Sequence, residues 1–380
     1  MRPAGSRPGR VGCSRCVTVI SGLAMESIPD PPKSVPSSVL PPSVRVAVVV
    51  NGNARGATDE VISSLNQLML GGDLFISRAI EEADEIAKIV VDRGYGTVLT
   101  GGGDGTFTTM VTKVVHEARR QGRPLPRFGF LKLGTGNALA YVVGAVGVKR
   151  GELAADFQRL RQETGSKKIH LVQVEDTLTP FCGFGLDALV LEDYHHVKAV
   201  LDSTPLKRVV PGLLGYAIAS TTRTMPRYLL QRTPECRIVN TGAPAQRLNE
   251  KGEPLGAPVA AGQVLYEGPA RLVGVSTIPY YGFGFRAFPF ADSRPGRMQI
   301  RIANLGIWQF SAHLRDIWSG RYQNAKAVFD YMVEEATIEM NPATAFQIGG
   351  DLVGSRSSVS VRVSPKPIRL VDFYAETDED

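Results

Sequence analysis

Apolar residues in the first half of the chain alternate between short continuous runs and helical spacing. Residues 44–50 read VRVAVVV, a continuous run typical of a buried parallel strand. The pattern then predicts, in order, a helix over residues 59–70, a strand over 73–76, a helix over 80–92, a strand over 95–99, a helix through 116–117 and a strand over 127–133. Strands that alternate with helices predict a parallel sheet with helices on both faces.

From about residue 169 the pattern changes to short alternating strands separated by glycine turns. The strand-like segments are IHLVQVE, TPFCGFGLDA, ARLVGVSTI, RMQIRIA, EATIEM, SVSVRVS and IRLVDFYA. Many short strands at close spacing predict an antiparallel sandwich. Residues 197–232 instead look helical and inserted, and residues 242–262 predict a hairpin or loop. The sequence leaves open whether the last strand returns to the first domain.

Composition and charge indicate a globular chain with a polar N-terminal segment. The chain has 380 residues, of which 43% are hydrophobic and 21% charged, and the usual ~100–200 residues per domain predict two domains. No apolar run approaches the ~18 residues that span a bilayer, so membrane association would be peripheral. The first 40 residues hold five basic and two acidic residues, half of the net charge of +6. The rest is too weakly basic to indicate a nucleic-acid partner.

These patterns divide the chain into four segments. We expect a disordered tail over residues 1–43, a nucleotide-binding domain over 44–165, a β-sandwich domain over 166–373 with a helical insert at 197–232, and an acidic tail over 374–380. Met25 is an alternative start. Four cysteines in a chain of this size do not form a disulfide scaffold, so a reducing cytoplasm is the default location.

Two glycine-rich segments follow predicted strands and precede predicted helices. Residues 100–110 read TGGGDGTFTTM and residues 130–140 read FLKLGTGNALA. At such junctions the backbone N–H groups and the helix N-terminus gather anions, and glycine lets a phosphate approach closely. Asp104 would repel a phosphate, so it indicates chemistry, either by orienting a metal ion or by accepting a proton. A tight turn with a helix N-cap at Asp104 or Thr106 also explains these residues.

Two better-known phosphate-binding patterns do not fit the first segment. A Walker A loop ends in Gly-Lys-Ser/Thr, and the nearest following lysine is Lys113, well inside the predicted helix. The Rossmann pattern needs a glycine three residues after its second glycine. The chain has Thr106 at that distance from Gly103, and Thr108 at that distance from Gly105.

The two segments together resemble the nucleotide-binding loops of the diacylglycerol kinase catalytic family, which includes bacterial lipid kinases and sphingosine kinases and shares a superfamily with NAD kinases. VVVNGNARG (48–56), FCGFGLDA (181–188) and FQIGGDLVG (346–354) are similar to the family's NP-x-(S/A)-G, GfDA and DGE segments, in the same order. The resemblance covers roughly residues 44–373. It implies an NAD kinase-like α/β N-terminal domain with a parallel sheet, and a mainly antiparallel β-sandwich C-terminal domain for the lipid. The implied activity is ATP-dependent phosphorylation of a lipid hydroxyl, with diacylglycerol as the default acceptor.

The resemblance also implies where ATP and the acceptor bind. The suggested ATP-binding residues are Asn51, Ser77, Gly102, Gly103, Asp104, Gly105, Thr106, Gly134, Thr135, Gly136 and Asn137. Ser77 is also explained as an ordinary strand-end serine, and Asn137 as a helix N-cap. Asp351 matches the second acid of DGE, which the family uses as the base, so Asp351 and Asp104 are the candidate catalytic residues. Replacement of Asp104 by Ala is expected to abolish activity and leave the fold intact.

Two departures from the family concern its acidic residues. Residues 349–351 read Gly-Gly-Asp, so the first acid of DGE is lost and the second is one methylene shorter. A turn aspartate between two strands also explains Asp351. Only Asp292 stands near the place of the acids that can hold a structural magnesium in the family, and the metal ligands stay unassigned. Mg²⁺ is expected to arrive with ATP.

Residues 197–232 hold six basic residues against Asp202 alone, beside apolar residues at helical spacing. Such a face fits an anionic membrane surface, although a helix that packs its apolar stripe on the core is the commoner explanation. We therefore expect a cytoplasmic protein, peripheral at the membrane, with a homodimer left open. Two alternative functions remain. One is an NAD kinase, which shares the GGDG loop, and the other is a catalytically silent nucleotide-binding regulator, suggested by the lost acids.

Overall fold

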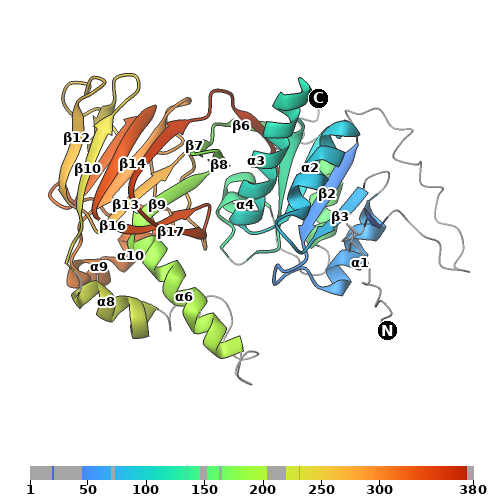
Figure 1. Cartoon of the computed structure of the whole chain (residues 1–380), viewed down its shortest axis with the longest axis horizontal. Helices are drawn as coiled ribbons and strands as arrows, with labels where there is room; N and C mark the ends of the chain where they lie inside the picture. Colours follow the sequence, from blue (N-terminus) through green and yellow to red (C-terminus); the bar gives the residue numbers. More distant parts are fainter. Residues whose placement is uncertain are drawn as a thin grey trace, which may run out of the picture.

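The computed structural model contains two domains, one built on a largely parallel sheet and the other on an antiparallel sheet (Figure 1). The structure describes residues 19–20, 45–69, 73–134, 136–145, 152–161, 165–202, 220–230 and 232–374. Thr135, most of the predicted N-terminal tail, the middle of the 197–232 segment and the end of the acidic tail therefore lie outside the described residues. Within the described ranges, no helix is both long and apolar enough to cross a membrane.

The N-terminal sheet has seven strands in the order β1-β3-β2-β4-β5-β18-β6. Their bounds are β1 (Val19–Ile20), β2 (Val46–Asn51), β3 (Asp73–Ser77), β4 (Thr97–Gly102), β5 (Arg127–Lys132), β6 (Ser166–Ile169) and β18 (Ile368–Val371). Strands β2 to β5 run parallel to one another. The continuous apolar run is confirmed as a buried strand, because residues 47–50 are at most 1% exposed.

Helices connect these strands. They are α1 (Asp59–Leu68), α2 (Glu82–Asp92), α3 (Asp104–Gln121), α4 (Ala138–Val143) and α5 (Glu152–Arg161). After β3 the chain crosses back over β2 to β4, so strands are then added on the other side of β2. Right-handed crossovers therefore place α1 on one face of the sheet and α2 and α3 on the other. The hydroxyl of Thr58 caps the start of α1, and Gly122 ends α3 with a φ of 64°. The predicted alternation of strands and helices is confirmed.

The C-terminal domain is an eleven-stranded antiparallel sheet, which confirms the predicted antiparallel fold class. Its strands are β7 (Val172–Val174), β8 (Thr177–Thr179), β9 (Phe181–Gly185), β10 (Glu235–Asn240), β11 (Gln246–Leu248), β12 (Val264–Pro269), β13 (Leu272–Ser276), β14 (Met298–Ala303), β15 (Val328–Val333), β16 (Glu335–Ile348) and β17 (Asp351–Val363). The helical segments of this domain are α6 (Leu186–Asp202), a π-helix (Ser220–Thr224), α8 (Met225–Leu230), α9 (Ile307–Ala312) and α10 (Leu314–Trp318).

The last strand returns to the first domain, which settles the topology that the sequence left open. Strand β18 pairs in parallel with β5 and antiparallel with β6. Apolar residues also pack across the joint, since Leu171, Leu178 and Phe181 belong to the buried cluster of the N-terminal domain, while the antiparallel sheet has a second cluster of its own. In addition, the Thr112 hydroxyl of α3 exchanges two hydrogen bonds with the backbone of Leu178, at 2.9 and 3.3 Å. The joint between the domains is therefore packed and hydrogen-bonded.

Candidate functional site

Parallel pairing brings the carboxyl ends of four strands to one edge of the N-terminal sheet. In the strand register Asn51 stands opposite Ser77, Val50 opposite Gly101, and Gly102 opposite Lys132. In open α/β sheets, ligands bind outside this edge. Most of the residues predicted to bind ATP therefore lie together, although they come from distant parts of the sequence.

The two glycine segments contact each other through their backbones. The Gly134 amide donates to the Gly102 carbonyl at 2.7 Å. A Cβ on Gly134 would overlap the backbone of Gly103, and one on Gly102 would overlap the side chain of Thr106. A Cβ on Gly103 would meet only the Cα of Gly134, at 3.8 Å. Gly102 and Gly134 are thus required by close packing, whereas Gly103 leaves open backbone at the edge of the sheet.

Asp104 bridges the two segments. It is the first residue of α3, yet its carboxylate accepts the amides of Ala138 (2.8 Å) and Leu139 (3.2 Å) at the start of α4. The side chain thus acts as an N-cap for a different helix, a role that sequence inspection assigned only to its own turn. Its carboxylate is charge-compatible with that helix N-terminus.

The environment of Asp104 shifts its protonation. Burial raises the pKa of Asp104 from 3.8 to about 6, and the nearby Asp351 carboxylate contributes in the same direction. The two amides of α4 act against this shift, because they favour the charged form. A carboxyl with this pKa is poised to exchange a proton near neutral pH.

Asn51 and Thr106 interact directly. The Asn51 side-chain amide donates to the Thr106 hydroxyl at 3.1 Å, and its carbonyl oxygen accepts the Asn53 amide at 2.9 Å. The Ser77 hydroxyl donates to the Ala79 carbonyl at 2.9 Å, a local turn contact that fits the strand-end interpretation. All three side chains lie at the sheet edge, and their contact with ATP stays a prediction.

Asn137 carries an unsatisfied acceptor. It has a φ of 51° before α4, and its side-chain amide donates to the Gly134 carbonyl, but its side chain makes no cap bond to α4. Its Oδ1 is buried and has no hydrogen-bond partner in the described part of the chain, and the residue is 1% exposed. A buried acceptor without a partner is rare, so this oxygen suits a donor from a bound ligand.

Asp351 reaches the first glycine segment from the other domain. Gly349 and Gly350, with φ of 59° and 88°, form the two-residue turn between β16 and β17, and Asp351 begins β17 directly after it. Its carboxylate lies so close to Gly105 that a Cβ there would overlap it. The structure therefore brings both candidate catalytic acids to the same loop.

The Asp351 turn is held by contacts that sequence inspection missed. The Gly349 amide donates to the Phe181 carbonyl at 2.9 Å, and the Gly350 amide donates to the side chain of Gln347 at 2.8 Å. Gln347 is fully buried and in turn donates to the Tyr281 hydroxyl. No motif marks this glutamine, so the sequence offered no signal for its role.

Two threonine side chains lie beside Gly349, the position of the first acid in the DGE motif. A side chain at Gly349 would overlap the Thr108 hydroxyl and meet the Thr179 hydroxyl at 3.0 Å. These two buried hydroxyls hydrogen-bond each other at 3.2 Å. A neutral threonine pair therefore fills the space next to position 349.

Two cations near the sheet edge were also missed. The Arg78 side chain lies over Gly52, where a Cβ would meet its Cγ at 3.0 Å. Lys132 ends β5, and its Nζ lies 5.1 Å from the centre of the Tyr141 ring. Neither cation forms an ion pair with a described residue. Arg78 directly follows β3 and Lys132 ends β5, within two residues of the ends of the predicted strands over 73–76 and 127–133, and this position is the signal that could have found them.

The acids present fit a magnesium ion that ATP carries in. Magnesium typically takes one or two protein carboxylates together with phosphate oxygens, and Asp104 and Asp351 supply two carboxylates at the glycine loop. Within the described ranges, no three His, Cys, Asp or Glu side chains gather as a metal-binding group. Asp292 lies exposed in the loop before β14, and the ligands of a separate structural magnesium stay unassigned.

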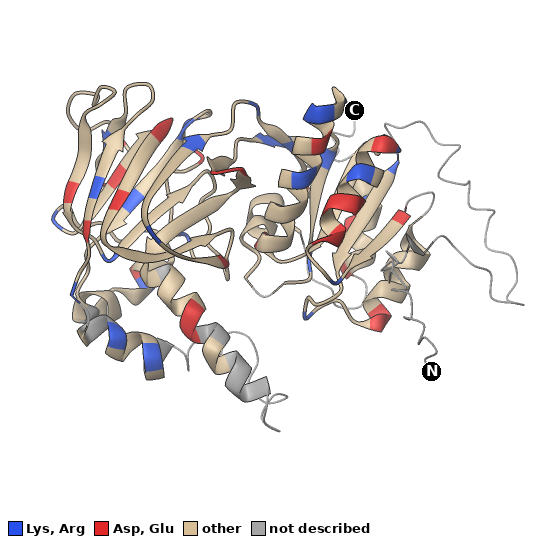
Figure 2. Cartoon of the chain, in the orientation of Figure 1, with Lys and Arg blue, Asp and Glu red and all other residues tan. Residues whose placement is uncertain are grey.

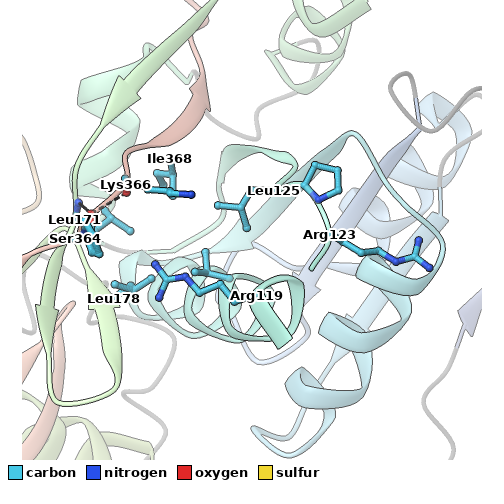
Figure 3. Close-up of a pocket in the computed structure, with 11 residues that line it drawn as sticks. Arg119, Arg123, Leu125, Leu171, Leu178, Ser364, Lys366 and Ile368 are labelled. Atoms are coloured by element: carbon cyan, nitrogen blue, oxygen red, sulfur yellow. Dashed lines mark hydrogen bonds between the residues drawn. The ribbon is translucent and has the colours of Figure 1, made fainter. Parts of the chain in front are cut away.

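One hollow of the described surface lies away from this site. It measures about 460 Å³ and lies between the C-terminal half of α3 and the segment that leads into β18 (Figure 3). Apolar residues such as Leu125 and Leu178 line it, with Arg119, Arg123 and Lys366. None of the predicted site residues lines this hollow, because they gather at the opposite end of α3.

The basic residues predicted to face a membrane are partly neutralised. Arg227 pairs with Asp193 at 2.7 Å and with Glu192 at 2.8 Å, and Arg223 pairs with Asp193 at 3.3 Å. In Figure 2 the basic residues appear on α8 and acidic ones on α6. These acids precede residue 197, so they were not counted with the insert. The other half of the insert lies outside the described residues.

Comparison with known proteins supports the resemblance read from the loops. Residues 45–174 match the family model of the diacylglycerol kinase catalytic domain. No curated protein matches the chain significantly. A solved structure from Bacillus anthracis str. Sterne, provisionally named a diacylglycerol kinase, has 15% identity, covers 86% of this chain and 96% of its own, and gives a TM-score of 0.59.

Two further structures were compared. A second crystal structure from the same strain, with the same provisional name, has 14% identity, covers 86% of this chain and 95% of its own, and gives a TM-score of 0.57. An NAD kinase from Archaeoglobus fulgidus in complex with ATP has 10% identity over 87% of this chain and 94% of its own. Its TM-score of 0.44 is too low to show a shared fold.

The geometry and the comparisons agree on the first domain. The glycine segments, the carboxyl edge and the order of the strands all lie within the matched region or complete its sheet. The chain also has the two-domain fold of the Bacillus anthracis proteins over most of its length. Residues 45–174 are therefore similar to the diacylglycerol kinase catalytic domain, the family that the glycine segments resemble.

Proposed function

We propose that the protein is an ATP-dependent lipid kinase that transfers the γ-phosphate of ATP to a lipid hydroxyl, with a diacylglycerol-like acceptor as the default. One observation carries this proposal. A carboxylate of the second domain, Asp351, contacts Gly105 of the glycine segment predicted to hold the phosphates. An acceptor-side acid and a donor-side loop meet there, as transfer between two substrates requires.

The proposed step is an in-line displacement at the γ-phosphorus. The acceptor hydroxyl forms a new O–P bond, the bond to the bridging oxygen of ADP breaks, and Asp351 takes the hydroxyl proton. Asp104 fixes the two glycine segments together through its bonds to α4. Magnesium carried by ATP would neutralise phosphate charge, and Asp104 and Asp351 are the carboxylates at the glycine loop that would hold it.

The test is phosphorylation of a lipid panel in detergent micelles with labelled ATP. We expect a phospholipid product, and we expect Asp351→Asn to lower turnover by ~100 to 10,000-fold without loss of ATP binding. Asp176→Asn is the matched control, because Asp176 is an exposed turn aspartate of the same sheet. It should retain wild-type turnover.

Three results would contradict the proposal in different ways. NADP formation from NAD and ATP would identify an NAD kinase. ATP binding without turnover on any acceptor would identify a silent nucleotide-binding protein. Full activity in Asp351→Asn would leave the lipid kinase in place but remove Asp351 as its base.

A further inference from the structure

Helices α9 and α10 present large apolar side chains to the surface. Trp308 is 84% exposed, Leu314 47% and Trp318 40%. The chain has two tryptophans in all, and both lie on this helix pair. We call Trp308, Leu314 and Trp318 the tryptophan face. Exposed apolar side chains that gather in one place mark an interaction surface.

The segment that carries the tryptophan face is basic. Residues 304–326 contain Arg315, Arg321 and Lys326 against one acid, Asp316. Arg321 pairs with Asp316 at 3.3 Å, whereas Arg315 and Lys326 pair with no acid in the described part of the chain. Tryptophan beside unpaired cations is the composition of segments that lie in the interface of an anionic bilayer.

The fold itself does not use the most exposed of these side chains. A small apolar cluster of Leu305, Ala327 and Val328 anchors the segment, with Ile317 and Tyr322 packed against it. Trp308 and Leu314 are not part of that cluster. Helices of six and five residues would not form alone, so this anchor presents the tryptophan face to its surroundings.

The tryptophan face is joined to the candidate site by one short loop. The Trp318 ring stacks on Phe285 with 5.3 Å between centres, and the Arg286 amide donates to the Trp318 carbonyl at 2.9 Å. In the same loop the Phe283 amide donates to the Gly136 carbonyl at 2.8 Å. Figure 1 shows α9 at the edge of the antiparallel sheet, apart from the N-terminal domain.

We propose that the tryptophan face is a membrane-binding surface that rests on an anionic bilayer. The inference rests on the proposed function for its purpose, because a lipid acceptor would be met at the bilayer surface. The unpaired cations attract the anionic headgroups, and the indole rings enter the boundary between headgroups and acyl chains. Binding there would hold residues 283–286, and with them the second glycine segment, next to the lipid.

Intrinsic fluorescence tests the proposal directly, because both tryptophans lie on this face. The full-length protein is mixed, without ATP, with vesicles of phosphatidylcholine containing phosphatidylserine, or with phosphatidylcholine alone. We expect a blue-shifted emission with the anionic vesicles and quenching by brominated acyl chains, both weakened by salt. Unchanged emission, or binding without quenching, would overturn the proposal.

Substitution separates the tryptophan face from other surfaces. Trp308→Ala should weaken vesicle binding by about ten-fold in sedimentation, since an interfacial indole is lost. Leu255→Ala is the matched control, because Leu255 is an exposed apolar residue (45%) in a loop of the same domain. It should bind like wild type. Circular dichroism checks folding, and Trp318→Phe leaves Trp308 as the sole fluorescent probe.

The outcomes distinguish the membrane-binding surface from the proposed kinase activity. Equal vesicle binding by wild type and Trp308→Ala would overturn the surface, and so would a lipid-free dimer that Trp308→Ala converts to monomer. Vesicle binding uses neither ATP nor an acceptor, and the detergent assay uses no bilayer. Binding without phospholipid product would therefore contradict the proposed kinase alone, and product without binding would contradict this surface alone.

Discussion

At the scale of single residues, Asp104 is a candidate catalytic acid and also caps helix α4. Its substitution should therefore lower stability as well as activity. Its carboxylate accepts two backbone amides at the start of α4. In Asp104→Ala these buried amides lose their partner, which typically costs about 1–3 kcal/mol of the free energy of unfolding. We expect a variant that is inactive and also less stable by this amount in urea denaturation. The sequence alone gave no reason to expect the loss of stability.

The isosteric variant separates structure from charge. Asp104→Asn keeps one acceptor oxygen for α4, so it should lose less stability than Asp104→Ala while losing the negative charge. Equal stability of wild type and Asp104→Ala would show that the contact with α4 contributes nothing.

The raised pKa of Asp104 predicts a pH dependence of stability. The folded protein binds this proton more tightly than the unfolded chain, because the pKa is about 6 when folded and 3.8 otherwise. The stabilising contribution is therefore full below pH 3.8 and is lost as the pH rises to about 6, by up to ~3 kcal/mol. Other acids titrate equally in wild type and Asp104→Asn. The unfolding free energy of wild type minus that of Asp104→Asn should thus decrease as the pH rises from about 4 to about 6.

Asp351 supplies the internal control for this pH dependence. Its carboxylate raises the pKa of Asp104, so Asp351→Asn should lower that pKa. The pH range over which the stability contribution of Asp104 is lost should then become narrower. A stability difference that does not change with pH would show that Asp104 keeps its ordinary pKa.

At the scale of elements, the β16–β17 turn explains why this chain has glycine where the family has an acid. Gly349 is left-handed, and its Cβ position is taken by the hydroxyls of Thr108 and Thr179. Gly349→Asp should cost about 2 kcal/mol of the free energy of unfolding, through overlap and a buried charge. Thr108→Ala removes the closest hydroxyl, while Thr179 still donates to the Phe181 carbonyl.

A double-mutant cycle checks this explanation. The combination of Gly349→Asp with Thr108→Ala should recover at least ~1 kcal/mol relative to the sum of the single changes, because the two positions touch. Additive effects in urea denaturation would mean that the threonine pair does not oppose an acid at position 349.

Some strands and helices could be predicted from the sequence and others could not. The parallel strands were predictable because both faces are buried and the runs are continuously apolar, as in Val46–Asn51. Strands β10, β12 and β15 were missed, because an antiparallel strand draws its stability from partners far along the chain. The glycine segments marked the site, whereas Gln347 could not be found, because its role depends on the Gly350 amide and the Tyr281 hydroxyl meeting in space.

At the scale of the whole molecule, apolar packing of Leu171, Leu178 and Phe181 and a pair of buried threonines join the two domains, and this predicts cooperative unfolding. The Thr112 hydroxyl both donates to and accepts from the Leu178 backbone, and both residues are buried. Thr112→Val keeps the shape but leaves two buried backbone groups unpaired, at a cost of about 2–4 kcal/mol. Helical circular dichroism reports mainly on the first domain, and the fluorescence of Trp318, whose ring stacks on Phe285, reports on the second. We expect the two signals to change at one urea concentration in wild type, and at one lower concentration in Thr112→Val. Thr337→Val, at an exposed pair with Ser360, should shift neither signal appreciably. Separate transitions in wild type would show that the domains fold independently, and the acids Asp104 and Asp351 would then owe their meeting to ligand binding and not to the joint between the domains.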